Sequence, residues 1–148
     1  MNKSFPNCLP LYLCILFSAC HAAAEAADKP NRVSPCPDSP NCVSSLSTDT
    51  AHFIEPFHYA GSLADARHKL INILRNARRV CLTEIKMDYI HAEFRSLVFQ
   101  FVDDVEFYFP PEKSIIHVKS ASRSGYYDFG VNRRRVERVR AAFGQTEK

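Results

Sequence analysis

The sequence predicts an α+β domain: a strand, a helix, a four-strand antiparallel meander and a second helix, with both helices packed on one face of the sheet. Three observations predict it. Apolar residues recur with helical spacing after Ser62, four strand-like segments follow with short connections, and helical spacing returns after Arg135. A run of strands between two amphipathic helices indicates a sheet whose apolar face is covered by both helices on one side.

The first two predicted elements lie between residues 50 and 77. Residues 50–59 form an apolar and aromatic stretch that we expect to be a strand, and Gly61 interrupts it. Ser62 is a favourable N-cap, and Asp65 follows three residues later, as in a capping box. The predicted helix has one apolar face, formed by Leu63, Ala66, Leu70, Ile73, Leu74 and Ala77. Its other side carries His68, Lys69, Arg75 and Arg78, which we interpret as an ordinary solvated face.

The four meander strands are predicted at residues 79–86, 89–97, 103–109 and 114–122. Their connections are short, which makes consecutive strands antiparallel neighbours. Apolar and polar residues alternate along them, so each strand has one core face and one polar face. The polar face combines acids with cations, namely His91, Glu93, Arg95, Asp104, Glu106, His117 and Lys119. We expect these side chains to pair across the strands on a solvated face.

The second predicted helix carries its apolar residues at Val136, Val139 and Phe143, with spacings of three and four. Residues 120–135 precede and enter this helix. They hold two of the four glycines and four arginines, and Arg133 to Arg135 fall in the first helical turn. Cations are unfavourable there, because the helix dipole is positive at its N-terminus. We therefore expect a compensating partner or a functional reason for them.

The N-terminal segment predicts export. Residues 1–19 contain an apolar run that is typical of a signal peptide and too short to span a bilayer. Cys20 follows Phe17-Ser18-Ala19, which resembles a lipobox except that Phe17 stands where leucine is usual. We favour a lipoprotein with Cys20 as its lipidated N-terminus, held to a membrane of the bacterial envelope; cleavage after Ala26 is the alternative. Residues 20–33 are then a flexible tether, 34–143 one domain and 144–148 a tail.

Two cysteines, Cys36 and Cys42, enclose a short loop that contains two prolines. In an exported protein a disulfide is the favoured interpretation. Two free thiols and a metal site are the remaining alternative interpretations, although a spacing of five residues does not suit the usual zinc-binding cysteine pair. Cys81 is then unpaired, and we expect it to be a buried small hydrophobic residue.

The charge of the chain is unevenly distributed. The net charge is +3, but residues 113–148 contain nine Lys/Arg against three Asp/Glu, so they carry +6 and the preceding part carries −3. Neutralisation within the fold and an anionic partner both account for this asymmetry.

Four segments in order, CPDSPNCVSS, YIHAEFRS, FVDDVEF and SASRSGYYDFGVNRRR, resemble the bacterial and plastid family called domain of unknown function 1499. The resemblance covers roughly residues 34–143. It implies signature positions at Cys36, Ser39, Pro40, Asn41, Cys42, Arg95, Asp103, Asp104, Ser122, Arg123, Gly125, Asp128, Gly130, Asn132 and Arg133 to Arg135. The family has no established activity, so the resemblance supports the place of a site and not a mechanism.

Three kinds of site remain open around residues 120–135. The acids and arginines can form a structural network, with Arg123 and one of Arg133 to Arg135 paired to Asp103, Asp104 or Asp128. They can bind an anion at a helix start capped by Asn132. Alternatively, Asp103 or Asp104 can act as acid or base with His91 or His117. The candidate ligand-binding residues are Arg95, Ser122, Arg123, Tyr126, Asp128, Asn132, Arg133, Arg134 and Arg135.

The sequence favours a non-catalytic envelope module that binds a small anionic ligand or a partner protein. The alternative is a small hydrolase or transferase that uses Asp103 and Asp104. No phosphate-binding loop, dinucleotide motif or zinc-protease motif is present, and we expect no cofactor, no metal and no nucleic-acid partner.

Overall fold

The computed structural model describes residues 33–97 and 100–145. It has the predicted α+β class, with two helices and one antiparallel sheet. The elements in chain order are β1 (Cys42–Ser44), β2 (Phe57–His58), α1 (Leu63–Asn76), β3 (Val80–Ile85), β4 (Tyr89–Arg95), β5 (Val102–Tyr108), β6 (Ile115–Ser122) and α2 (Val131–Gly144).

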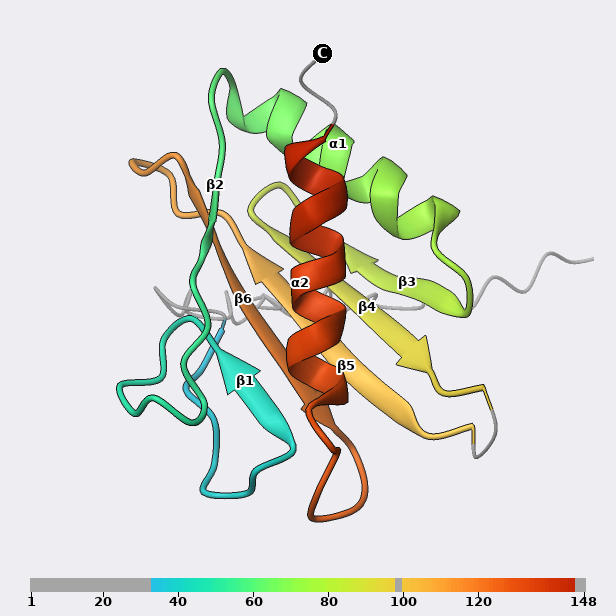
Figure 1. Cartoon of the computed structure of the whole chain (residues 1–148). Coiled ribbons are helices and arrows are strands. Elements are labelled where there is room, and N and C mark those ends of the chain that lie inside the picture. The colour runs from blue at the N-terminus through green and yellow to red at the C-terminus, as the bar shows by residue number, and fades with distance from the viewer. Residues whose placement is uncertain (1–32, 98–99, 146–148) are drawn as a thin grey trace, which may run out of the picture.

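The sheet has the strand order β1-β6-β5-β4-β3. Strand β2 pairs with the N-terminal end of β6, on the same edge as β1 (Figure 1). Strands β3 to β6 form the predicted meander, with every neighbouring pair antiparallel. Both helices lie on one face of the sheet (Figure 1), and α2 runs along the strands while α1 crosses near the C-terminal end of α2. We call the face under the helices the inner face and the opposite one the outer face.

The core lies between the inner face and the two helices. Alternation along the strands places Ile90, Ala92, Val105, Phe107 and Val118 in it, each at most 1% exposed. Helix α1 contributes Leu70 and Leu74, and α2 contributes its apolar stripe of Val136, Val139 and Phe143. Phe57 of β2 closes the core with its ring 5.9 Å from that of Phe107 and 5.8 Å from that of Phe143.

The start of α1 is as predicted. Ser62 is the N-cap, and its hydroxyl accepts a hydrogen bond of 3.1 Å from the backbone N–H of Asp65. This bond satisfies one of the N–H groups that have no partner within the helix.

The structure differs from the sequence predictions at four places. The expected strand over residues 50–59 is reduced to Phe57–His58, and β1 at Cys42–Ser44 was not predicted. Val33, assigned to the tether, is buried at 1% exposure. Cys81 is exposed rather than buried, because it pairs in register with Glu93 and so faces outward from the edge strand β3.

Candidate functional site

The adjacent acids Asp103 and Asp104 point to opposite faces of β5. Asp103 is 4% exposed under α2, where it pairs with Arg135. Asp104 is on the outer face, where it pairs with Arg123. Successive side chains of a strand alternate between faces, so these acids cannot share a site. The predicted pairing of Arg123 and of one helix-start arginine with these acids is confirmed, but the pairs belong to two separate networks rather than one.

The inner network joins the sheet to the start of α2. Arg135 pairs with Asp103, and its Nη1 also donates to Asn132 Oδ1 at 2.6 Å and to Ser120 Oγ at 3.2 Å. The Ser120 hydroxyl in turn donates to Asn132 Oδ1 at 2.6 Å. Within the described residues, no buried side-chain nitrogen or oxygen lacks a hydrogen-bond partner. Such complete pairing is what makes a buried polar cluster tolerable.

The loop before α2 is fixed by Asp128. Its carboxylate accepts from the backbone N–H of Gly130 and of Asn132, both at 2.8 Å. The N-cap is Gly130, with a φ of 73°, so the prediction that Asn132 caps the helix is wrong. Asn132 lies inside the helix and is completely buried, where its Nδ2 donates to the carbonyl of Asn41 at 2.9 Å. Asp128 therefore supplies the negative charge that the helix start prefers.

The three arginines at this helix start have separate partners. Arg135 enters the inner network. Arg133 donates to the carbonyl oxygens of Phe53 and Ala51, both at 2.8 Å, and so holds the loop before β2. Arg134 donates to the carbonyl oxygen of Phe129 at 2.8 Å. The arginines thus form contacts within the fold rather than one cationic cluster.

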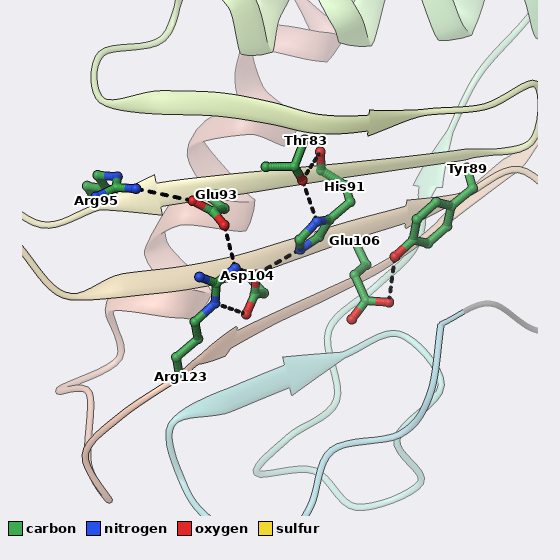
Figure 2. A network of polar contacts seen from close by, with 8 residues as sticks. All are labelled: Thr83, Tyr89, His91, Glu93, Arg95, Asp104, Glu106 and Arg123. Atoms are coloured by element: carbon green, nitrogen blue, oxygen red, sulfur yellow. Dashed lines mark hydrogen bonds and ion pairs between the residues drawn. The ribbon is translucent and has the colours of Figure 1, made fainter.

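The outer network extends across β3 to β6 (Figure 2). Arg123 donates through Nε and Nη2 to both oxygens of Asp104, each at 2.8 Å, and through Nη2 to Glu93 at 2.5 Å. His91 Nε2 lies 2.8 Å from Asp104 Oδ1, and its Nδ1 lies 2.5 Å from Thr83 Oγ1. Arg95 is the weakest member, at 3.4 Å from Glu93. The predicted self-paired polar face is present.

The electrostatics of the outer face follow these contacts. Partial burial raises the pKa of Asp104, but hydrogen bonds from Arg123 and His91 outweigh it, so its pKa lies below the usual value. The same carboxylate and Glu93 raise the pKa of Arg123. His117 is separate from the network: its Nδ1 is 3.1 Å from Ser45 Oγ, and burial and nearby Lys113 lower its pKa.

A groove lies on the other side of the molecule, between α1, α2 and the end of β4. Its volume is about 780 Å³, within the usual range for small-molecule sites. Its apolar lining includes Ile73, Phe94 and Val139, and its cationic lining consists of Lys69, Arg78, Arg79, Arg95, Arg135 and Arg138. None of the lining residues that the structure describes is acidic.

Arginine and aromatic groups shape the floor of this groove. The Arg135 guanidinium lies over the Phe94 ring, 5.1 Å from its centroid. Burial lowers the pKa of Arg135, while Asp103 acts in the opposite direction. At the rim, Arg78 and Arg138 form no ion pair with any residue in the described part of the chain. Their charges are therefore available to a ligand.

The groove includes only two of the candidate ligand-binding residues, Arg95 and Arg135. Ser122 and Asn132 belong to the inner network, where Asn132 Nδ2 donates to Ser122 Oγ at 3.1 Å. Arg123 belongs to the outer network, and Tyr126 is 73% exposed on the loop before α2. The predicted solvated face of the first helix was misassigned in part, because Lys69 lies in the groove. The sequence feature that could have indicated the cationic groove was the pair Arg78-Arg79 directly after that helix.

The disulfide between Cys36 and Cys42 is present, as predicted. It lies beside Asn41, whose Nδ2 donates to the carbonyl oxygen of Gly125, so it braces the loop before α2. Over the described ranges, no group of three or more His, Cys, Asp or Glu is arranged to hold a metal ion. The same residues include no helix of the length and apolarity that a membrane span requires.

Comparison with known proteins identifies the family. The chain belongs to the family described as "Protein of unknown function (DUF1499)", whose model matches residues 32–143. No curated protein and no solved structure matches the chain significantly.

Proposed function

We propose that this family member is a non-catalytic binding module whose ligand is a small anion with an apolar part, bound in the groove between α1 and α2. The observation that carries the proposal is the lining of the groove: six cationic side chains, and no acid among the lining residues described, above an apolar floor. Ligand sites combine such apolar walls with a few convergent polar groups.

The two parts of the lining imply two parts of the ligand. Arg78 and Arg138 supply guanidinium donors, which suit carboxylate or phosphate oxygens. Ile73, Phe94 and Val139 supply an apolar wall. A fully hydrophilic anion would not cover this wall and would leave its apolar surface exposed to water. An alkyl phosphate or a fatty acid carries both features.

Acid–base catalysis by Asp103 and Asp104 has less support. Asp103 is bound by buried Arg135, and Asp104 accepts hydrogen bonds from Arg123 on the opposite face. Neither acid lines the groove. An ionised carboxylate held by an arginine is a poor proton donor near neutral pH, because pairing favours its charged form.

A thermal-shift experiment with decyl phosphate tests the proposal. A ligand that binds only the native state raises the unfolding midpoint. We expect decyl phosphate to raise it, and decanol and inorganic phosphate to do so much less. The variant Arg78→Gln/Arg138→Gln should weaken decyl phosphate binding by roughly tenfold or more, since hydrogen bonds to charged groups each contribute about 1.5–3 kcal/mol.

Arg75→Gln is the matched control, because Arg75 is an exposed arginine of α1 that does not line the groove. Its decyl phosphate affinity should equal that of the unaltered protein. Equal losses in the control and the groove variant would indicate non-specific charge binding and would contradict the proposed site, as would the absence of any midpoint shift.

The predicted envelope location and lipid anchor at Cys20 remain proposals, because residues 1–32 lie outside the described part of the chain. Mass spectrometry of the mature N-terminus tests them. A diacylated Cys20 supports the anchor, and an unmodified Ala27 contradicts it.

A further inference from the structure

Exposed large hydrophobic side chains are concentrated at one end of the molecule. Among the described residues seven are exposed, and five of them lie on the two loops that follow β4 and β6: Leu97, Phe101, Tyr126, Tyr127 and Phe129. Figure 1 shows the loop before α2 projecting beyond the end of the sheet at which β4 and β6 end. The strand ends that bear the two loops are neighbours, since the N–H of Arg123, just after β6, donates to the carbonyl of Val102 at the start of β5 at 3.1 Å. We call this surface the aromatic end.

Side-chain contacts hold the loop before α2, which carries three of these five residues. The Tyr127 and Phe129 rings meet edge to face, with centroids 5.0 Å apart. The carbonyl of Gly125 accepts from Asn41 beside the disulfide, and Asp128 fixes the turn into α2. Phe129 has a φ of 54° and yet is 77% exposed. Left-handed backbone is unfavourable for phenylalanine, so the fold holds this ring in water against both conformational and hydrophobic preference.

The charge around the aromatic end is positive. Arg79, Arg133 and Arg134 donate only to backbone carbonyl oxygens among their described partners, so no acid neutralises them. Asp38, on the adjacent disulfide loop, is exposed and opposes one of these three charges. Asp128 at the start of α2 opposes a second, since its backbone hydrogen bonds do not remove its charge. One positive charge therefore remains in excess among these residues.

We propose that the aromatic end docks on the surface of an anionic lipid bilayer, with Tyr126, Tyr127 and Phe129 at the level of the lipid headgroups. Tyrosine side chains are enriched at that depth, because the ring is apolar and the hydroxyl remains hydrated. Arginines beside the rings would contact lipid phosphates, and binding of this kind combines buried apolar area with attraction to anionic lipid. A projecting tip suits a bilayer better than a protein, since a stable protein interface needs about 800 Å² from each partner.

This inference does not depend on the proposed ligand, although the groove reaches the same end. Arg95 and Ser96, just before Leu97, and Val131, just after the Phe129 turn, all line it. A docked aromatic end would place one end of the groove near the lipid.

Tryptophan fluorescence in the full chain tests the proposal directly, because the protein contains no tryptophan. The variant Tyr126→Trp places a reporter at the aromatic end. With vesicles of phosphatidylcholine and phosphatidylglycerol we expect its emission to shift to shorter wavelength and to be quenched by brominated acyl chains. With phosphatidylcholine alone the shift should be much smaller. The reporter senses its own surroundings, so attachment through the N-terminal segment alone does not produce the signal.

Met87→Trp is the matched control, because Met87 is 77% exposed, close to the 73% of Tyr126, but lies in the β3–β4 turn, away from the aromatic end. Its emission should not change. In the Tyr126→Trp background, Arg134→Gln should lower the partition coefficient about fivefold, and Phe129→Asn by roughly tenfold or more. Asparagine tolerates the left-handed backbone at this position, so the loop is retained.

Several results would overturn the proposal. Emission of the Tyr126→Trp reporter that is unaffected by either vesicle, or equal changes from both reporters, would show that the aromatic end does not enter the interface. A shift that follows protein concentration without lipid, together with dimer formation in sedimentation, would show that this end contacts a second copy of the chain.

Discussion

The two faces of the sheet each carry an aspartate–arginine pair, and the two pairs differ chiefly in burial. Asp103 and Arg135 have side chains 6% and 9% exposed, whereas those of Asp104 and Arg123 are 26% and 46% exposed. A charge buried without its partner is strongly destabilising, while an exposed pair contributes little. The same pair of residue types therefore fixes the helix on one face and only orders side chains on the other.

The largest expected effect is on the inner network. Asp103→Ala should lower the free energy of unfolding by about 3–5 kcal/mol, because it leaves Arg135 buried without its carboxylate. Urea unfolding measures this loss. The matched control is Asp104→Ala, the same change at the next residue. Equal losses from the two substitutions would contradict the difference between the faces.

Removal of the disulfide should have the second largest effect on the free energy of unfolding. Cys36→Ser/Cys42→Ser should cost about 2–3 kcal/mol in the chain-entropy model. Asn41, next to Cys42, joins the inner network through Asn132. The loss should therefore be non-additive with Asn132→Ala but additive with Asp104→Ala, because only neighbouring sites couple. Additivity with both would show that the disulfide does not brace the inner network.

The sequence predicted the sheet and both helices because their signals are local: alternation, helical spacing and a capping serine. It also predicted that Arg123 and one of Arg133 to Arg135 pair with nearby acids, and Arg123–Asp104 and Arg135–Asp103 do so. It did not predict which of the paired arginines is buried. Which arginine lies under the helix depends on the rotation of α2 over the sheet, and that is a tertiary property.

The groove was missed for a related reason. Arg78 and Arg138 lie 60 positions apart in the numbering. Arg78 follows the charged face of α1 and Arg138 belongs to that of α2, and each face is ordinary when considered alone. Only the packing of α1 beside α2 brings them to one surface. The strand over residues 50–59 was overestimated because only Phe57 and His58 pair with β6. The carbonyl oxygens of Ala51 and Phe53 instead accept hydrogen bonds from Arg133 of α2.

A smaller effect is expected for the outer network at neutral pH. Asp104→Ala should cost less than about 1 kcal/mol. The pKa of Asp104 is lowered in the folded protein, so its contribution is present above the ordinary value of 3.8 and is lost as the pH falls through the lower folded pKa. Urea unfolding at neutral pH and near pH 3 should show the gap between protein and variant closing in acid. A gap that widens in acid would contradict this assignment.

The smallest expected effect concerns His117, which lies on the outer face like His91 but beside Ser45 instead of an acid. Burial and Lys113 lower the pKa of His117, so the unfolded chain binds a proton at a higher pH than the folded protein does. Stability should therefore decrease as the pH falls below the ordinary value of 6.5, until the folded protein is protonated as well. His117→Gln removes this group, so the variant should lose less stability than the unaltered protein between neutral pH and pH 5. Unfolding midpoints across that range measure the difference, with His58→Gln as the control at an exposed histidine. If the two histidine variants have the same pH dependence, His117 is not the group that titrates.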